Sequence, residues 1–203
     1  MPLILTPIVT DNFTPDSNPL NPVNWVTFPA FTALQALGGT CQATSLATTS
    51  GANNQAVLPN DQYCSVTLAA FLQGSGNDFG ISVRGDNTSG SDGYILTVID
   101  NLVPGQVTIS LNGGFLPGVS VDLPFAIGDV FTIAAVGPKI YVLQNGLEVL
   151  QATDFVFNGG LAGAGIDVFT ANLADVQMSN FVAGGAVSVG GASGFFSPRW
   201  VSR

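Results

Sequence analysis

Carboxylates are the residues of this chain with the clearest chemical potential. The sequence holds thirteen acidic residues, and Glu148 is the single glutamate among them. Retaining hydrolysis of a glycosidic bond needs two carboxyl groups about 5 Å apart, one as nucleophile and one as acid/base. Glu148 has no carboxylate two residues away on either side, and no two aspartates stand two or four residues apart on a predicted strand. The sequence therefore predicts no hydrolytic pair and no enzyme.

The residues needed for other catalytic chemistries are missing. The chain has no histidine, which removes Ser-His and Cys-His nucleophile pairs and the common zinc sites. It has no Gly-x-Ser-x-Gly motif, and its glycine-rich runs lack the lysine of a phosphate-binding loop. We therefore expect neither covalent nor nucleotide chemistry.

Calcium is the one metal that the composition favours, because hard cations bind carboxylate and carbonyl oxygens. One polar loop holds Asp86, Asn87 and Asp92, and a second group would converge if the two ends of the chain pair: Asp11, Asp154, Asp167 and Asp175. Ordinary turn chemistry also explains Asp and Asn at such positions. We expect no cofactor, with a structural calcium ion as the alternative.

A sugar-binding site needs an aromatic platform and a few polar side chains that fix orientation. Apolar residues alternate with other residues from Phe79 to Arg84, which places Arg84 on the face opposite the core. The alternatives are a surface charge for Arg84 and a core position for Tyr94. The predicted ligand-binding residues are Arg84, Tyr94, Asp86, Asn87 and Asp92.

Short apolar runs with β-branched and aromatic residues predict the elements that position these side chains. The clearest are a strand at residues 130–136 and a hairpin with arms at 140–144 and 147–151. Asn145-Gly146 joins the arms, since both residues tolerate the positive φ of a type I′ turn. Further strands are predicted at residues 40–47, 62–72, 79–84, 94–99, 106–111, 119–123, 164–169 and 175–182.

The pattern predicts one all-β domain without an amphipathic helix. Residues 1–10 are predicted as an extended arm or edge strand, because their prolines suit an edge, and the polar residues 48–59 as a long loop. Six residues in alternating or fully apolar segments are predicted to be buried: Trp25, Val66, Ile81, Val98, Ile133 and Val142.

Composition limits the partners of this domain. The 203 residues are 46% hydrophobic, enough for one core, and only 8% are charged. The net charge of −9 includes just four basic residues, so no basic patch exists to bind nucleic acid. We find no apolar run long enough to span a membrane and no signal peptide, and we expect no membrane partner.

Cys41 and Cys64 admit two interpretations. They form one disulfide if their strands are neighbours, or they are two buried free thiols. Because free cysteine behaves as a small hydrophobic residue, and Cys64 alternates with Val66 and Leu68, we prefer the free thiols.

Residues 9–183 carry several spaced motifs. They are Asp11 and Phe13, Asn24-Trp25, Arg84, Tyr94, Gly128 to Val130, Asn145-Gly146, and Asp154 followed by Gly160, Gly163 and Gly165. In this order the motifs resemble the concanavalin A-like lectin/glucanase superfamily, particularly its laminin-G-like bacterial and phage domains. The resemblance implies a jelly-roll sandwich of two antiparallel sheets, with ligands on the concave face or its rim loops. The family's glycanases carry Glu-x-Asp-x-Glu on one strand, which this chain lacks.

The sandwich is predicted to cover residues 11–183, with a flexible glycine-rich linker and an arm at 184–203. Aromatic and arginine side chains anchor interfaces, and the predicted partner-docking residues are Phe195, Phe196, Arg199, Trp200 and Arg203. Their positive charge would meet an acidic chain, which favours a second copy and a homo-oligomer or lattice. A tail without a role is the alternative.

Members of the superfamily bind glycans, hydrolyse them or only build surfaces, so the fold does not choose the function. Many Thr, Ser, Asn and Gly residues without an export signal favour a virion decoration protein on a phage surface. The alternative is a carbohydrate-binding module or adhesin at an extracellular surface, and a glycanase is the most remote candidate.

Overall fold

The computed structural model describes residues 2–85, 93–100, 102–113, 119–157, 163–170 and 172–189. Every paired strand in these ranges runs antiparallel to its neighbour, and none of the described residues form a helix. No membrane-spanning helix is therefore found in this part of the chain. The predicted all-β class is confirmed.

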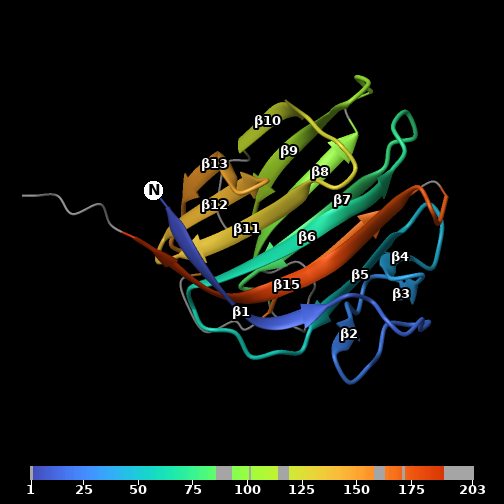
Figure 1. Ribbon diagram of the computed structural model, residues 1–203, viewed down its shortest axis with the longest axis horizontal. Coiled ribbons are helices and arrows are strands. Elements are labelled where there is room, and N and C mark those ends of the chain that lie inside the picture. The colour runs from blue at the N-terminus through green and yellow to red at the C-terminus, as the bar shows by residue number, and fades with distance from the viewer. Residues whose placement is uncertain are drawn as a thin grey trace, which may run out of the picture.

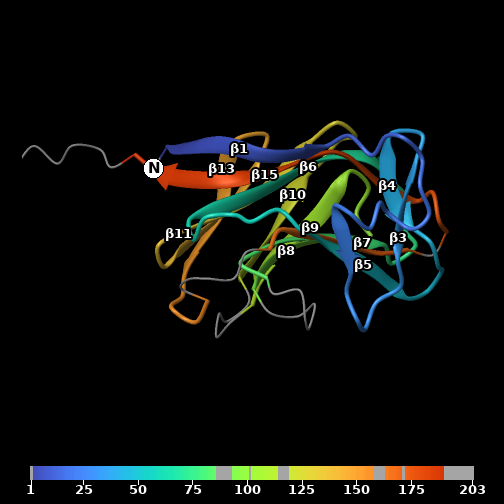
Figure 2. The same ribbon diagram turned by 90° about the horizontal axis from the view of Figure 1, so that it is seen from below.

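The strands form two sheets that pack face to face (Figures 1 and 2). The eight-stranded sheet has the order β13-β12-β11-β6-β15-β4-β3, and β1 also pairs with β15. Its strands are β1 (Leu3–Asp11), β3 (Leu34–Leu37), β4 (Thr40–Ala43), β6 (Gln62–Phe71), β11 (Val130–Val136), β12 (Lys139–Gln144), β13 (Leu147–Thr153) and β15 (Val176–Ser188).

The seven-stranded sheet has the order β10-β9-β8-β7-β14-β5-β2. Its strands are β2 (Trp25–Thr27), β5 (Thr49–Asn54), β7 (Asp78–Val83), β8 (Tyr94–Asp100), β9 (Gln106–Asn112), β10 (Val119–Pro124) and β14 (Gly165–Phe169). Alternate residues of both sheets point inward and form one continuous core, as period-2 alternation requires. The two-layer jelly-roll sandwich predicted from the sequence is confirmed.

All six residues predicted to be buried lie in this core: Trp25, Val66, Ile81, Val98, Ile133 and Val142. Cys41 and Cys64 are also buried there, and both thiols are free. The preferred interpretation of the cysteines is therefore confirmed.

The hairpin β12-β13 forms at Asn145-Gly146, as predicted. Both residues have positive φ, 54° and 78°, which Asn and Gly tolerate. The Asn145 side chain accepts a hydrogen bond from Val130 N–H at 2.9 Å and donates one to Asp129 Oδ1 at 2.7 Å. The turn is thereby tied to the start of β11.

The prediction of a loop at residues 48–59 is wrong, because β5 occupies Thr49–Asn54. The segment is too polar to resemble a strand, yet it pairs with β14 on one side and β2 on the other. Ser50 is buried and shares a 2.6 Å hydrogen bond with the Thr32 hydroxyl. Neighbouring strands and hydrogen bonds, rather than apolar side chains, stabilise β5.

Gly184–Ser188 were predicted to begin a flexible linker, and this is also wrong. They continue β15 and pair with the edge strand β1. A side chain at Gly184 would place its Cβ only 2.1 Å from Thr6 O, so the absent side chain lets the backbone of β1 approach. Here glycine marks close contact between strands rather than flexibility.

Candidate functional site

Arg84, predicted on the outer face, is instead buried at one end of the sandwich with only 1% of its surface exposed. Strand β7 ends at Val83, and Arg84 has φ 55°, in the left-handed region. The period-2 alternation stops where the strand stops, so the side chain turns inward. Its predicted outward orientation is wrong for this reason.

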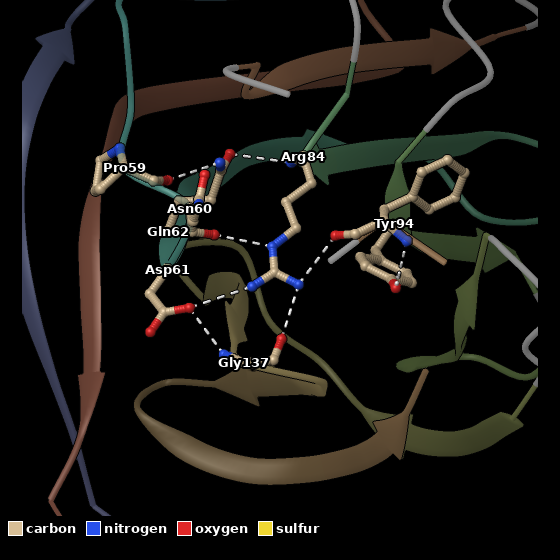
Figure 3. Close-up of polar contacts among 8 residues, drawn as sticks. Pro59, Asn60, Asp61, Gln62, Arg84, Tyr94 and Gly137 are labelled. Atoms are coloured by element: carbon tan, nitrogen blue, oxygen red, sulfur yellow. Dashed lines mark hydrogen bonds and ion pairs between the residues drawn. The ribbon is translucent and has the colours of Figure 1, made fainter. Parts of the chain in front are cut away.

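The Arg84 guanidinium is surrounded by backbone carbonyls (Figure 3). It donates to Asn60 O at 2.9 Å, Gly137 O at 2.8 Å and Phe157 O at 3.1 Å, and it pairs with Asp61 at 3.3 Å. Burial lowers the pKa of Arg84, and Asp61 acts in the opposite direction. Arg84 therefore joins three segments and is a structural residue.

Tyr94 occupies a core position, which was the alternative to its predicted ligand-binding role. The ring is buried, and the hydroxyl donates to Asp154 Oδ2 at 2.9 Å while accepting from Phe157 N–H at 3.2 Å. Burial raises the pKa of Tyr94. The hydroxyl thus both donates and accepts a hydrogen bond within the protein.

The remaining predicted site residues lie outside the described residues. They are Asp86, Asn87 and Asp92 of the predicted ligand-binding set, and Phe195, Phe196, Arg199, Trp200 and Arg203 of the predicted docking set. For these residues the roles stay predictions.

The carboxylates of the second predicted calcium group do not converge. Asp11 accepts hydrogen bonds from Trp25 Nε1 and Phe13 N–H, Asp154 bonds to Tyr94, and Asp175 bonds to Asn172. Within the described ranges, no three acidic or thiol side chains come together as a metal-binding group.

Two aspartates do meet on the outer face of the seven-stranded sheet. Strands β7 and β14 pair so that Asp167 lies opposite Gly80, and Phe169 opposite Asp78. Asp78 and Asp167 are therefore diagonal neighbours, a relation that separates residues by about 7–8 Å. Strand pairing creates the carboxylate pair that spacing along one strand did not predict.

Glycines surround Asp167. Gly80 of β7 and Gly51 of β5 are its cross-strand partners, so no side chain stands directly beside it on either side. A Cβ at Gly80 would lie 2.2 Å from Asp167 Oδ1, so the carboxylate leans over Gly80. The Asp167 carboxylate has no hydrogen-bond donor in the described part of the chain.

Aromatic side chains border this carboxylate. Phe28 and Phe31 stack edge to face at 5.3 Å and lie over Gly51, where a Cβ would be 2.5 Å from the Phe31 ring. On the other side of the pair, alternation places polar side chains of β7, β8 and β9 on the same face. We call the following residues the polar patch: Asp78, Ser82, Thr97, Ser110 and Asp167.

Burial and, as the smaller cause, the charge of Asp78 together raise the pKa of Asp167 to about 7. Burial also raises the pKa of Asp78 to about 6, although the Phe169 N–H that it accepts acts in the opposite direction. The pair thus begins to hold a proton near neutral pH. Carboxylates in this state accept hydrogen bonds when ionised and donate one when protonated.

Sequence reasoning named Asp167 only as a calcium candidate and missed Asp78 as a site residue. The alternation in Asp78–Val83 and in Gly165–Phe169 places both carboxylates on the face opposite the core, so this orientation could be predicted from the sequence. The pairing of β7 with β14 could not be predicted, because the two strands lie far apart in the sequence.

A hollow of about 440 Å³ lies within the proline-rich segment after β1. Two of its polar groups are used locally: Asp11 bonds to Trp25, and Asn21 Oδ1 accepts from Val23 N–H at 3.0 Å.

Comparison with known proteins finds likeness in structure only. No protein-family model matches the sequence, and no curated protein does. A carbohydrate-binding module, CBM66 from Bacillus subtilis, superposes with TM-score 0.56 and 17% identity over 81% of this chain and 96% of that one. A legume lectin-like domain from Entamoeba histolytica superposes with TM-score 0.55 and 13% identity over 92% of this chain and 100% of that one. An endo-beta-1,3-glucanase from Pyrococcus furiosus superposes with TM-score 0.59 and 11% identity over 94% of this chain and 100% of that one.

This chain has the concanavalin A-like jelly-roll fold. The sequence resemblance is confirmed at this level. The fold does not imply a function, so the function must be argued from the residues of the site.

Proposed function

We propose that this protein binds carbohydrate on the outer face of its seven-stranded sheet and does not hydrolyse it. The observation that carries the proposal is the environment of the Asp167 carboxylate. It lies between two glycines, and no residue in the described part of the chain donates a hydrogen bond to it. A sugar hydroxyl would supply that donor.

The surroundings of Asp167 suit a sugar ring. The Phe28-Phe31 pair gives an apolar border, and Thr97 and Ser110 add neutral hydrogen-bonding groups on the same face. Phosphates and other anions would be repelled by Asp78 and Asp167, so the ligand is expected to be neutral. The structurally similar proteins include a carbohydrate-binding module, a legume lectin-like domain and an endo-beta-1,3-glucanase, which supports the proposal.

A glycan hydrolase is the second candidate, and one observation favours it. Asp78 and Asp167 are diagonal neighbours whose backbones lie about 7–8 Å apart, which brings two carboxyl groups onto one face as a glycosidase requires, and both pKa values are raised. Binding without hydrolysis is preferred because Asp78 accepts a backbone N–H and the one glutamate, Glu148, lies on the other sheet.

A glycan array, followed by calorimetric titration of the bound sugars, tests the proposal. Asp167→Ala is expected to weaken binding at least about tenfold, the effect of losing one or two charge-assisted hydrogen bonds. Asp16→Asn, a change at an exposed carboxylate of a distant loop, is the matched control and should leave the affinity unchanged. If the unmodified protein releases cleavage products from a glycan and Asp167→Asn does not, the protein is a hydrolase and the proposal of binding without hydrolysis is wrong.

A more specific role is decoration of a virion surface, with the protein located there or at another extracellular surface. Composition alone supports this role. A particle lattice would present many copies of the polar patch and so raise the avidity for a glycan-covered surface. Imaging of particles from the source with a labelled antibody would test it.

A further inference from the structure

The outer face of the eight-stranded sheet carries a second apolar cluster, separate from the core between the sheets. It consists of Tyr63, Ala134, Tyr141, Leu143 and Ala186. Outer sheet faces are normally polar, so an apolar cluster there needs a cover.

Strand β1 supplies part of this cover. Leu3 and Leu5 pack against the cluster, and Figure 2 shows β1 as the outermost strand on this side of the sandwich. Between β1 and the β12-β13 hairpin a groove of about 430 Å³ stays open, lined by Pro2, Leu3, Leu5, Tyr141, Leu143 and Leu147. Leu147 is 73% exposed at its rim. The five cluster residues themselves are buried, so what stays open is the groove beside them, with Leu147 at its rim.

We propose that this groove binds residues 195–203 of the same chain. The proposal does not depend on the proposed carbohydrate binding, because the groove and the polar patch belong to different sheets.

Chain continuity supports this occupant. Val189 N–H donates to Pro2 O at 3.0 Å, so β15 delivers the chain beside a residue that lines the groove. Residue 195 follows six positions later and can lie within about 20 Å of Val189. The intervening residues are mostly glycine, alanine and serine, which permits a change of direction. A segment tethered this closely has an effective concentration in the millimolar range, which favours the same chain over a second copy.

The chemistry of the segment fits the groove. Phe195, Phe196 and Trp200 match the leucine and tyrosine lining, and aromatic residues dominate binding to such surfaces. Residues 195–203 contain two basic side chains, Arg199 and Arg203, and no Asp or Glu. The acidic side chain of Glu148 lines the groove. The attraction of opposite charges sets the orientation of the segment.

Fluorescence of Trp200 tests the proposal in the full chain. Trp25 is the other tryptophan, and its buried emission is removed by subtracting the spectrum of the Trp200→Phe variant. The difference spectrum is expected to lie at short wavelength, as for an apolar site. Leu147→Asp should move it to long wavelength and speed tryptic cleavage after Arg199. Val23→Asp is the matched control, since Val23 is similarly exposed, at 77%, in a loop beyond the other end of β1, and it should change neither.

Two results would overturn the proposal. A difference spectrum already at long wavelength in the unmodified protein would show Trp200 in water. A short-wavelength spectrum that moves to long wavelength on dilution would show that a second copy, rather than the same chain, occupies the groove.

Discussion

At the scale of single residues, Arg84 shows how a buried cation can organise a loop-rich end of a sandwich. Its guanidinium satisfies carbonyls of residues 60, 137 and 157, which come from three separate connections. Each of these carbonyls would lose the hydrogen bond that Arg84 donates if the side chain were removed. Stability, rather than ligand binding, is therefore the function assigned to Arg84.

Arg84→Leu is expected to destabilise the fold by about 2–4 kcal/mol, because three carbonyls lose a charge-assisted hydrogen bond while the Asp61 carboxylate left behind is partly exposed. Urea unfolding of the variant and the unmodified protein measures this difference. Lys139→Met, at a less buried cation of β12, should change stability by less than about 1 kcal/mol. A small loss for Arg84→Leu combined with loss of sugar binding would instead make Arg84 a ligand residue.

Asp167 gives the protein a stability that depends on pH. Below pH 3.8, the ordinary pKa of the carboxyl group, both folded and unfolded chains carry the proton. Between about pH 4 and 7 the unfolded chain releases it while the folded chain keeps it, so the free energy of unfolding falls as pH rises. Above about pH 7 this contribution is constant and unfavourable.

Asp167→Asn removes the titration, and we expect the variant to be more stable than the unmodified protein at pH 8. The difference should be on the order of 2 kcal/mol after allowance for solvent screening, and it should vanish near pH 4. Unfolding in denaturant at a series of pH values measures it. A variant that is equally stable across the whole series would show that Asp167 titrates in the folded protein as it does in water.

At the scale of elements, a glycine in β7 makes room for the carboxylate that the neighbouring strand β14 contributes to the polar patch. Gly80 leaves room for the Asp167 carboxylate, and a side chain at that position would collide with it. Gly80→Ala is therefore expected to cost about 1–3 kcal/mol in stability. The cost should fall below about 1 kcal/mol in an Asp167→Ala background, where the carboxylate is absent.

A double-mutant cycle of thermal or urea unfolding gives the coupling between these two positions. Equal costs of Gly80→Ala in both backgrounds would contradict the close contact of Asp167 with Gly80.

Strand prediction from the sequence succeeded where side-chain chemistry alone fixes the structure. Val130–Val136 is rich in apolar and β-branched residues, and the predicted and observed limits of β11 agree. It failed at β5 and at the end of β15, where polar or glycine residues form strands because their neighbours supply hydrogen bonds and close contacts. Such strands depend on the tertiary structure, which a local pattern does not contain.

At the scale of the whole molecule, the fold was predictable and the site was not. Alternation and turn residues are local, so they indicated a sandwich whose core includes Trp25 and Val142. The site depends on which strands become neighbours, and Asp78 and Asp167 meet only through the pairing of β7 with β14. Arg84 illustrates the same limit, since a single positive φ reversed its predicted orientation.

Global unfolding should be needed to expose either thiol. Cys41 and Cys64 lie in the core between the sheets, and burial raises the pKa of both. We expect alkylation by iodoacetamide only at denaturant concentrations that unfold the protein, as followed by mass spectrometry. Fast labelling of the native protein would contradict a closed core around these residues.

The location of the bound sugar is the measurement that tests the proposed function most directly. Backbone amide shifts in NMR spectra, recorded while the best glycan-array ligand is added, report which strand it contacts. We predict changes confined to β7, β8, β9, β14 and the Phe28-Phe31 segment, their loss in Asp167→Ala, and a ligand recovered intact. Changes confined to the eight-stranded sheet, or no changes with any sugar, would contradict carbohydrate binding at the polar patch.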